Sequence, residues 1–216
     1  MEEQFSYTNV QSQPKSLIKN YDGSGRNIVL GITGTSGAIY GLRMLRALIK
    51  CEYNIDLIMT DFAQYSMLNE CNVEFTQNNI SMLFPELIIM KSTIRIHNNL
   101  DLKSELFTNN YECHGMIICP CAAGVLGGIA GGDAKTLIEK SADYAMSYGT
   151  PLVIVPRETP LNKIHLGNMM RLIDNGAKIV PAMPAFDFNP RDFNDLADYI
   201  AGRVLELLNR NNQSLV

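Results

Sequence analysis

The sequence predicts an α/β fold in which helices cover both faces of a parallel sheet. Segments that are apolar throughout, such as NIVLGIT, alternate along the chain with amphipathic segments of helical length. Strands without a polar face are typical of parallel sheets that are buried on both sides. The chain has 216 residues, 46% of them apolar and 19% charged, so it is long enough for one domain with a sizeable core.

The elements follow one another in strand–helix order. We expect strands at residues 28–33, 55–60, 115–119 and 152–156, and a shorter strand at 178–180. We expect helices near residues 37–50, 63–69, 136–148, 163–175 and 191–209. The least regular part, residues 72–110, is expected to add a short strand and a loop over the site. Residues 1–26 are expected to form a polar, partly mobile extension, residues 27–210 the domain, and residues 211–216 a tail.

Composition argues against several classes of protein. The net charge of −4 does not favour nucleic-acid binding, and no apolar run reaches the roughly 18 residues of a membrane helix. The N-terminus lacks the basic and apolar regions of a secretory signal, so we expect a cytoplasmic protein. Five irregularly spaced cysteines do not indicate a disulfide framework, and the Cys119-Pro120-Cys121 spacing is not that of a zinc or thioredoxin site. We expect no metal.

A turn rich in glycine and hydroxyl side chains follows the first strand, with the sequence Gly34-Thr35-Ser36-Gly37. At the start of a helix, such a turn presents unpaired backbone N–H groups and the positive end of the helix dipole. Ser36 can cap the helix or hydrogen-bond a ligand. The glycine spacing differs from the G-x-G-x-x-G dinucleotide fingerprint. The turn is therefore compatible with a phosphate or flavin site, and also with a plain strand–helix connection.

Polar or small residues also follow the other strands, at the edge where parallel sheets bind ligands. Thr60 ends the second strand and Glu70 follows it, while small residues at 122–125 allow a flat ligand to approach the backbone closely. Arg157 can pair with a phosphate, and Glu158 can relay protons if burial raises its pKa. The structural alternatives are helix capping by Thr60, a flexible loop at 122–125 and a local Arg157–Glu158 ion pair.

Five stretches in this order resemble the UbiX-type flavin prenyltransferases: GITGTSGAIYGLRML, CPC, VPRETPL, IHLGNMMRL and GAKIVPAMPAF. The resemblance extends over residues 27–208 and reaches more distantly to flavin-dependent peptidyl-cysteine decarboxylases. It implies a three-layer Rossmann-like or flavodoxin-like fold that assembles into trimers or dodecamers, with the flavin site between subunits. It also implies the transfer of a dimethylallyl group from dimethylallyl phosphate to N5 and C6 of reduced FMN, without a metal. The product would serve a UbiD-type decarboxylase.

The resemblance also implies roles for individual residues. FMN-binding positions of the family are matched by Gly34, Thr35, Ser36, Thr60 and Arg157. An acid implicated in proton handling is matched by Glu70, and the acid beside the flavin-binding Arg is matched by Glu158. Ser36, Glu70 and Glu158 are therefore the catalytic candidates. An Arg that binds the prenyl phosphate is matched by Arg203.

Other positions depart from the family pattern. Ser147 replaces a Lys, Lys140 an Arg, and Asp187 a Tyr, so the region of the prenyl phosphate loses positive charge and gains a negative one. A hydroxyl-rich loop is replaced by residues whose backbone N–H groups can still bind FMN, namely Ala122, Ala123, Gly124 and Val125. We therefore expect a retained FMN site and an altered donor site, with Lys140, Asp187 and Arg203 as substrate-binding candidates.

Three functions fit these observations. The first is a flavin prenyltransferase with a variant donor site, and the second is an FMN-binding relative with different flavin chemistry. The third is a non-catalytic flavin carrier or regulatory subunit. Cysteine decarboxylases usually have a His just after the flavin turn, where this chain has Ala38-Ile39-Tyr40, which argues against that class. His97 and His165 lack metal-ligand spacing and are assigned no role.

Overall fold

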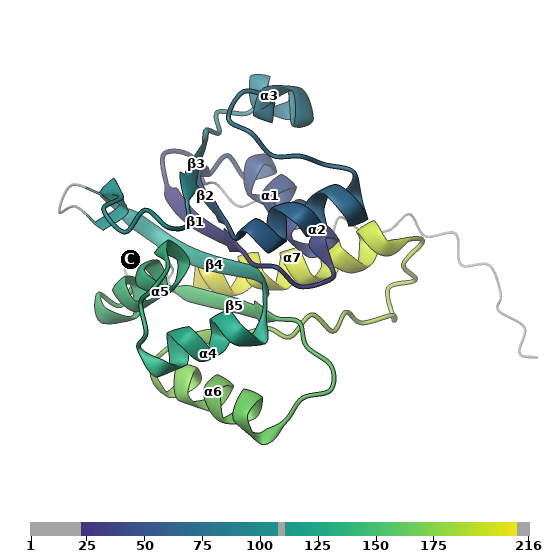
Figure 1. The fold of residues 1–216 in the computed structure, drawn as a ribbon. Helices are drawn as coiled ribbons and strands as arrows, with labels where there is room; N and C mark the ends of the chain where they lie inside the picture. Colours follow the sequence, from purple (N-terminus) through teal and green to yellow (C-terminus); the bar gives the residue numbers. More distant parts are fainter. Residues whose placement is uncertain (1–22, 108–110, 211–216) are drawn as a thin grey trace, which may run out of the picture.

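The computed structural model describes residues 23–107 and 111–210, so residues 1–22 of the expected extension and the expected tail lie outside the described residues. Six parallel strands form one sheet in the order β3-β2-β1-β4-β5-β6 (Figure 1). They are β1 (Asn27–Ile32), β2 (Asn54–Met59), β3 (Ile94–Asn98), β4 (Cys113–Cys121), β5 (Leu152–Pro156) and β6 (Lys178–Ile179). The predicted parallel sheet is confirmed, and so is the short extra strand, which is β3.

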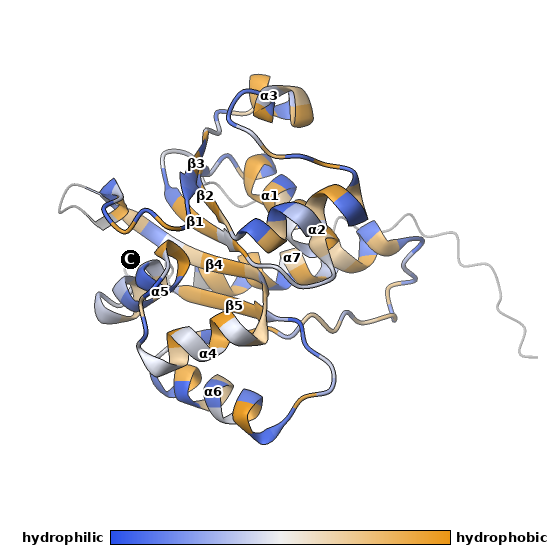
Figure 2. Cartoon of the chain, in the orientation of Figure 1, coloured by the Kyte–Doolittle hydropathy of each residue, from blue (hydrophilic) through white to orange (hydrophobic). Residues whose placement is uncertain are grey.

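Helices cover both faces of the sheet. On one face lie α1 (Ala38–Lys50), α2 (Asp61–Cys71) and α7 (Phe193–Arg210), and on the other lie α4 (Ala123–Gly131), α5 (Leu137–Ser147) and α6 (Lys163–Asp174). Each face of the sheet has its own apolar core. Successive residues of β1 point to opposite faces, so that Leu30 packs in the core on the α1 side and Val29 in the core on the α5 side. Figure 2 shows largely apolar strands between helices in which apolar and polar residues alternate.

The sequence did not predict four short elements. The helix α4 was expected only as a Gly/Ala-rich segment, and the 72–110 region contains α3 (Ile80–Leu83), η1 (Pro85–Ile88) and η2 (Glu105–Phe107). Four glycines lower the helix propensity of α4, but Leu126 and Ile129 on one of its faces are buried against the sheet. Tertiary burial therefore outweighs local propensity. No helix within 23–107 and 111–210 is long and apolar enough to cross a membrane.

The order of the strands determines where a ligand can bind. The chain proceeds from β1 through β2 to β3 at one edge, and then returns past β1 to β4. In such a sheet the helices that follow β1 and β4 lie on opposite faces, which opens a crevice beyond the carboxyl ends of these two strands. The 34–37 turn follows β1, and residues 122–125 follow β4, so both segments lie at this crevice.

Candidate functional site

The 34–37 turn is closely packed beneath α2. A Cβ atom on Gly34 would lie 2.4 Å from Cβ and Cδ1 of Phe62, so only glycine fits there. Gly37 has a φ of 97°, a left-handed conformation that glycine adopts without strain. The turn therefore needs both glycines for its shape, and Phe62 covers one side of it.

The N-terminus of α1 is held by a carboxylate from another helix. No side chain of its own turn caps α1, but Oε2 of Glu70 accepts hydrogen bonds from the backbone N–H of Gly37 (2.7 Å) and of Ala38 (2.9 Å). A negative group at this position is favoured by the positive end of the helix dipole. The structure thus brings the predicted catalytic candidate Glu70 onto the predicted flavin-binding turn.

Two hydroxyls of the expected site bind the protein backbone. Oγ1 of Thr60 accepts hydrogen bonds from Gly34 N (3.0 Å) and Ala63 N (3.1 Å), so the capping alternative for Thr60 is realised while its O–H can still donate. Thr35 Oγ1 donates to the carbonyl of Arg157 (3.2 Å). Ser36 is exposed, and no side-chain hydrogen bond of its hydroxyl occurs within the described chain. Ser36 is therefore the hydroxyl of the turn that is available to a ligand.

Arg157 and Glu158 leave β5 beside the turn. A Cβ on Gly37 would lie 3.9 Å from Cγ of Arg157. Burial raises the pKa of Tyr40 and Cys119 adds to the rise, while the nearby Arg157 opposes it, so Tyr40 remains protonated. Glu158 accepts a hydrogen bond from Thr159 N (3.0 Å), and no Arg157–Glu158 ion pair is found among the described residues.

A pocket of about 130 Å³ opens at the carboxyl end of β5. It is lined by polar groups of Arg157, Glu158 and Thr159 and by apolar groups of Leu161, Met169 and Met183, with Pro156, Pro181 and Ala182 completing the wall. An apolar pocket with a few converging polar groups is the usual form of a small-molecule site.

The backbone N–H groups at the start of α4 face the same edge of the sheet. The helix begins after Ala122 without a side-chain cap, so the first-turn amides of Ala123, Gly124 and Val125 have no acceptor within the helix. The amide of Ala122 itself donates to Oγ1 of Thr33, a buried residue that the sequence analysis did not single out. Thr33 looks like the last residue of an apolar strand, and only its position in the folded sheet reveals these partners.

The cysteines of the Cys119-Pro120-Cys121 stretch are structural. Both thiols are fully buried in β4, and all five cysteines are free. Burial raises the pKa of both thiols, to about 12 for Cys121, so neither is ionised near neutral pH. No group of three or more His, Cys, Asp or Glu side chains suited to a metal occurs in the described part of the chain.

Known proteins resemble both this fold and this sequence. A family model described as Flavoprotein matches residues 16–205. Flavin prenyltransferase UbiX of Alkalihalophilus pseudofirmus is 37% identical over 183 residues, which cover 84% of this chain and 90% of that protein. Flavin prenyltransferase UbiX of Pseudomonas aeruginosa is 36% identical over 184 residues, which cover 84% of this chain and 88% of that one. The chain belongs to the UbiX-type flavin prenyltransferase family.

Solved structures of UbiX-type proteins have the same architecture. AnUbiX (PadA1), solved in complex with FMN and dimethylallyl pyrophosphate, superposes with a TM-score of 0.74 and 32% identity, covering 85% of this chain and 92% of that one. A dodecameric FMN-dependent UbiX-like decarboxylase from Escherichia coli O157:H7 superposes with a TM-score of 0.72 and 31% identity, covering 83% and 92%. The predicted three-layer fold is therefore confirmed.

One chain of this UbiX-type protein does not bring the predicted donor-binding residues together. Lys140 lies on α5, where Nζ donates to Leu102 O (2.8 Å), while Arg203 lies on α7 and pairs with Glu206. The helices α5 and α7 cover opposite faces of the sheet. Asp187 is exposed in the segment before α7, and Ser147 ends α5. Lys140 and Arg203 therefore cannot bind one phosphate within the same chain.

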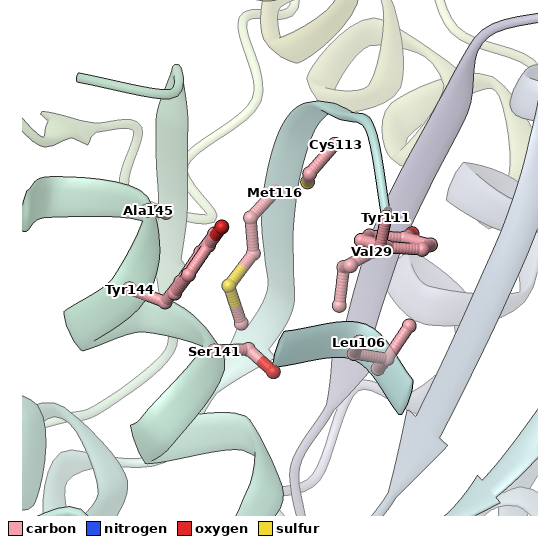
Figure 3. A pocket seen from close by; sticks show the side chains of 8 residues that line it. All are labelled: Val29, Leu106, Tyr111, Cys113, Met116, Ser141, Tyr144 and Ala145. Carbon is pink, nitrogen blue, oxygen red and sulfur yellow. The ribbon is translucent and has the colours of Figure 1, made fainter. Parts of the chain in front are cut away.

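A second cavity of the UbiX-type chain lies away from this crevice and is too small for a substrate. It measures about 10 Å³ and lies between the first halves of β1 and β4 and the last turns of α5 (Figure 3). Its lining is almost entirely apolar, with Met116, Ala145 and Leu106 among its walls. A space of this size holds at most about one water molecule, so it is a packing gap at the amino end of the sheet.

Proposed function

We propose that this protein is a flavin prenyltransferase that moves a dimethylallyl group from dimethylallyl phosphate to reduced FMN. One observation carries the proposal: Glu70 and Arg157, distant in sequence, both meet the turn that presents the free hydroxyl of Ser36. These are the residues that the resemblance assigns to flavin binding and proton handling. Membership of the family and the FMN and dimethylallyl pyrophosphate bound by AnUbiX support the same conclusion.

The residues at the crevice fit FMN. The side of the turn at Gly34 has no room for a side chain, and α4 begins with amides that lack a side-chain cap. Amides at a helix N-terminus and the guanidinium of Arg157 suit an anionic group, while the small residues 122–125 admit a flat one. Reduced FMN, when bound, supplies the ring atoms that accept the prenyl group. Ser36, Thr35, Thr60 and the 122–125 amides would hold it.

We assign proton handling to two carboxylates. Glu70 is fixed on the α1 amides at the turn, and Glu158 borders the pocket at the end of β5. The apolar walls of this pocket, Leu161, Met169 and Met183, suit a short branched hydrocarbon such as a dimethylallyl chain. In this arrangement Ser36 orients the acceptor and the carboxylates take up protons that the acceptor loses.

The donor phosphate requires a second copy of the chain. A departing phosphate needs positive charge nearby, and the candidates Lys140 and Arg203 lie on opposite layers of the fold. We therefore place the donor site at a contact between subunits, with Asp187 as a substrate-contacting residue that lowers the positive charge there. The E. coli relative is dodecameric, which supports self-association here as a trimer or dodecamer. A UbiD-type decarboxylase is the proposed recipient of the product.

The test is an anaerobic reaction of the purified protein with reduced FMN. Dimethylallyl phosphate and dimethylallyl pyrophosphate are supplied in separate reactions, and the flavin is analysed by mass spectrometry. We expect a flavin heavier by one prenyl group with at least one donor. Ser36→Ala and Arg157→Ala should lower product formation, while Lys50→Ala, far from the crevice at the end of α1, should not. Unmodified FMN with both donors, and with donors of other chain lengths, would contradict the proposal.

The altered donor positions favour one alternative. Ser147 and Asp187 reduce the positive charge expected at a donor phosphate. In the alternative, the protein binds FMN but no prenyl donor, and it acts as a flavin carrier or performs different flavin chemistry. The same experiment separates the two functions. Yellow protein with stoichiometric FMN and no prenylated flavin supports the alternative, whereas prenylated flavin excludes a purely non-catalytic role.

A further inference from the structure

Hydroxyl groups join the ends of three strands into one ring of hydrogen bonds. In the turn after β1, Thr35 Oγ1 donates to Arg157 O (3.2 Å), and Arg157 N, just after β5, donates to Cys121 O (3.1 Å) on β4. The next residue, Ala122, donates through its amide to Thr33 Oγ1 (2.6 Å), which returns the ring to β1. The ring surrounds the carboxyl ends of the strands at which we place FMN.

Thr33 makes the most hydrogen bonds of the residues in this ring. It is 1% exposed, and both its backbone N–H (3.2 Å) and its hydroxyl (3.0 Å) donate to the carbonyl of Pro120. Its oxygen also accepts from Ala122 N, so one side chain contacts the residue before Cys121 and the residue after it. Donor and acceptor capacity of a hydroxyl are both used, and no apolar side chain can replace them.

Both segments proposed to bind FMN depend on this one residue. Gly34, the first residue of the turn, follows Thr33 directly, and Ala122 is the residue from which α4 starts. The helix has no side-chain cap, so the direction of its first amides follows from the backbone at Ala122. Without the Thr33 hydroxyl, the part-buried amide of Ala122 loses its hydrogen-bond acceptor, while the Pro120 carbonyl keeps only the hydrogen bond from Thr33 N.

We propose that Thr33 is a positioning residue that holds the 34–37 turn and the 122–125 amides in register for FMN. It acts through Ala122 and Pro120 and does not itself contact the flavin. The inference rests on the proposed function for the identity of the ligand, but the register of the two segments is a property of the ligand-free chain.

The test compares Thr33→Val, which keeps the shape and removes the hydroxyl, with Thr33→Ser, which keeps the hydroxyl. Ser92→Ala is the matched control, because Ser92 is also buried and donates to a backbone carbonyl, that of Ile49, at the opposite end of the sheet. FMN affinity is measured by fluorescence quenching at a temperature well below the unfolding midpoint of every variant. Amide hydrogen exchange of residues 122–125 is measured without ligand.

We expect Thr33→Val to weaken FMN binding roughly tenfold or more and to speed exchange at Ala122, as expected from the loss of one or two buried hydrogen bonds. Thr33→Ser should keep the FMN affinity and the Ala122 exchange rate of the unmodified protein. Ser92→Ala should lower the unfolding midpoint but change neither the FMN affinity nor the exchange rate at Ala122. Unchanged FMN affinity in a folded Thr33→Val protein overturns the inference.

The outcome for Thr33 remains separate from that for the proposed function. If the unmodified protein binds no FMN, the proposed function fails, and the exchange data alone decide the role of Thr33. Faster exchange at Ala122 in Thr33→Val, reversed in Thr33→Ser, supports the positioning role. Equal exchange at Ala122 in the unmodified protein, Thr33→Val and Thr33→Ser overturns it. If Thr33→Val fails to fold, Thr33→Ala is used at lower temperature for the same measurements.

Discussion

Glu70 illustrates how a single residue in this site can have two roles. Its carboxylate accepts two hydrogen bonds from the start of α1, which is a structural role, and we propose proton handling as its second role. An amide oxygen can accept the same hydrogen bonds but cannot take up a proton, so substitution separates the two roles.

We expect Glu70→Gln to keep most of the stability and lose prenyl transfer. Removing the charge from the helix N-terminus costs about 0.3–1 kcal/mol, and removing the cap altogether in Glu70→Ala costs about 1 kcal/mol or somewhat more. Urea unfolding measures the stability of both variants, and anaerobic product formation measures their prenyl transfer. A Glu70→Gln protein with normal activity would leave Glu70 as a helix cap only.

The residues of the site differ in how far the sequence alone could place them. Ser36 and Gly34 belong to a recognisable local turn, and their roles as an exposed hydroxyl and a residue without room for a side chain agree with that turn. Thr33 was missed because its partners Pro120 and Ala122 are more than eighty residues away in the chain. Nothing local distinguishes a hydroxyl that joins two strands from one that simply ends a strand.

At the level of elements, a buried carboxylate holds the edge strand β3. Asp56 on β2 is 1% exposed and accepts hydrogen bonds from Arg95 (2.8 and 3.0 Å) and Tyr111 (2.6 Å), with His97 Nε2 2.7 Å away. His97 Nδ1 lies 3.4 Å from the hydroxyl of Ser104. The cluster joins β2, β3 and the start of the chain segment that leads into β4.

Asp56→Asn should destabilise the protein by about 1–3 kcal/mol, because it leaves half-exposed Arg95 and the part-buried donors His97 and Tyr111 without their carboxylate. Denaturant unfolding at pH 7 measures this loss. Asp143→Asn is the control, since Asp143 is exposed on α5 and its replacement should change stability by less than about 0.5 kcal/mol. Equal effects of the two substitutions would contradict a stabilising role for the cluster.

The contribution of Asp56 should also depend on pH. Burial raises the pKa of Asp56, but hydrogen bonds from His97, Arg95 and Tyr111 outweigh it and hold the pKa below its usual value. A carboxylate with a lowered pKa in the folded state stabilises the protein above its unfolded pKa of about 3.9, and this stabilisation is lost as the pH falls through the folded value. The stability difference between the unmodified protein and Asp56→Asn should therefore shrink as the pH falls below about 4. A difference that persists unchanged at low pH would contradict this assignment.

The helix α4 shows what sequence patterns miss at the scale of elements. Its glycines suggested a loop, yet Gly128 allows close packing, since a Cβ there would lie 2.4 Å from Oε1 of Glu139, while Gly127 faces Asn168 of α6. The neighbours α5 and α6 supply these contacts. Helix formation here is a consequence of packing, which no window of local sequence contains.

At the scale of the whole molecule, α6 presents an apolar surface to solvent. Of its twelve residues only Leu172 is buried, while Leu166, Met170 and Ile173, which share one side of the helix, are 48%, 65% and 52% exposed. Exposed apolar side chains gathered on one helix mark an interaction surface, and the relative from E. coli is dodecameric. A second copy of this chain is the partner that we expect there.

We therefore expect the purified protein to be an oligomer and Met170→Glu/Ile173→Glu to dissociate it, because a charge buried at an apolar contact is costly. Light scattering after size-exclusion chromatography measures the mass. Lys50→Glu, which places the same charge at the exposed end of α1, should leave the assembly intact. A monomeric unmodified protein, or a double variant of unchanged mass, would rule out α6 as the contact.

The sequence by itself determined which segments form most of the strands and helices, and that helices cover both faces of one parallel sheet. Fully apolar strands and amphipathic helices depend on hydrophobic patterns of a few residues, which are visible in short stretches of sequence. The glycine-rich turn after β1 and the motifs shared with the UbiX family were likewise readable from short stretches of chain.

Only the tertiary structure decided how the site is built. It placed Glu70 on the α1 amides, used the hydroxyls of Thr33, Thr35 and Thr60 to join strand ends, and left Ser36 free. It also set Lys140 and Arg203, the predicted donor-binding residues, on helices that cover opposite faces of the sheet. The physical reason is that hydrogen-bond partners and the sides of a sheet follow from strand order and register. Strand order and register in turn are set when the whole chain buries its apolar residues between the sheet and the helices.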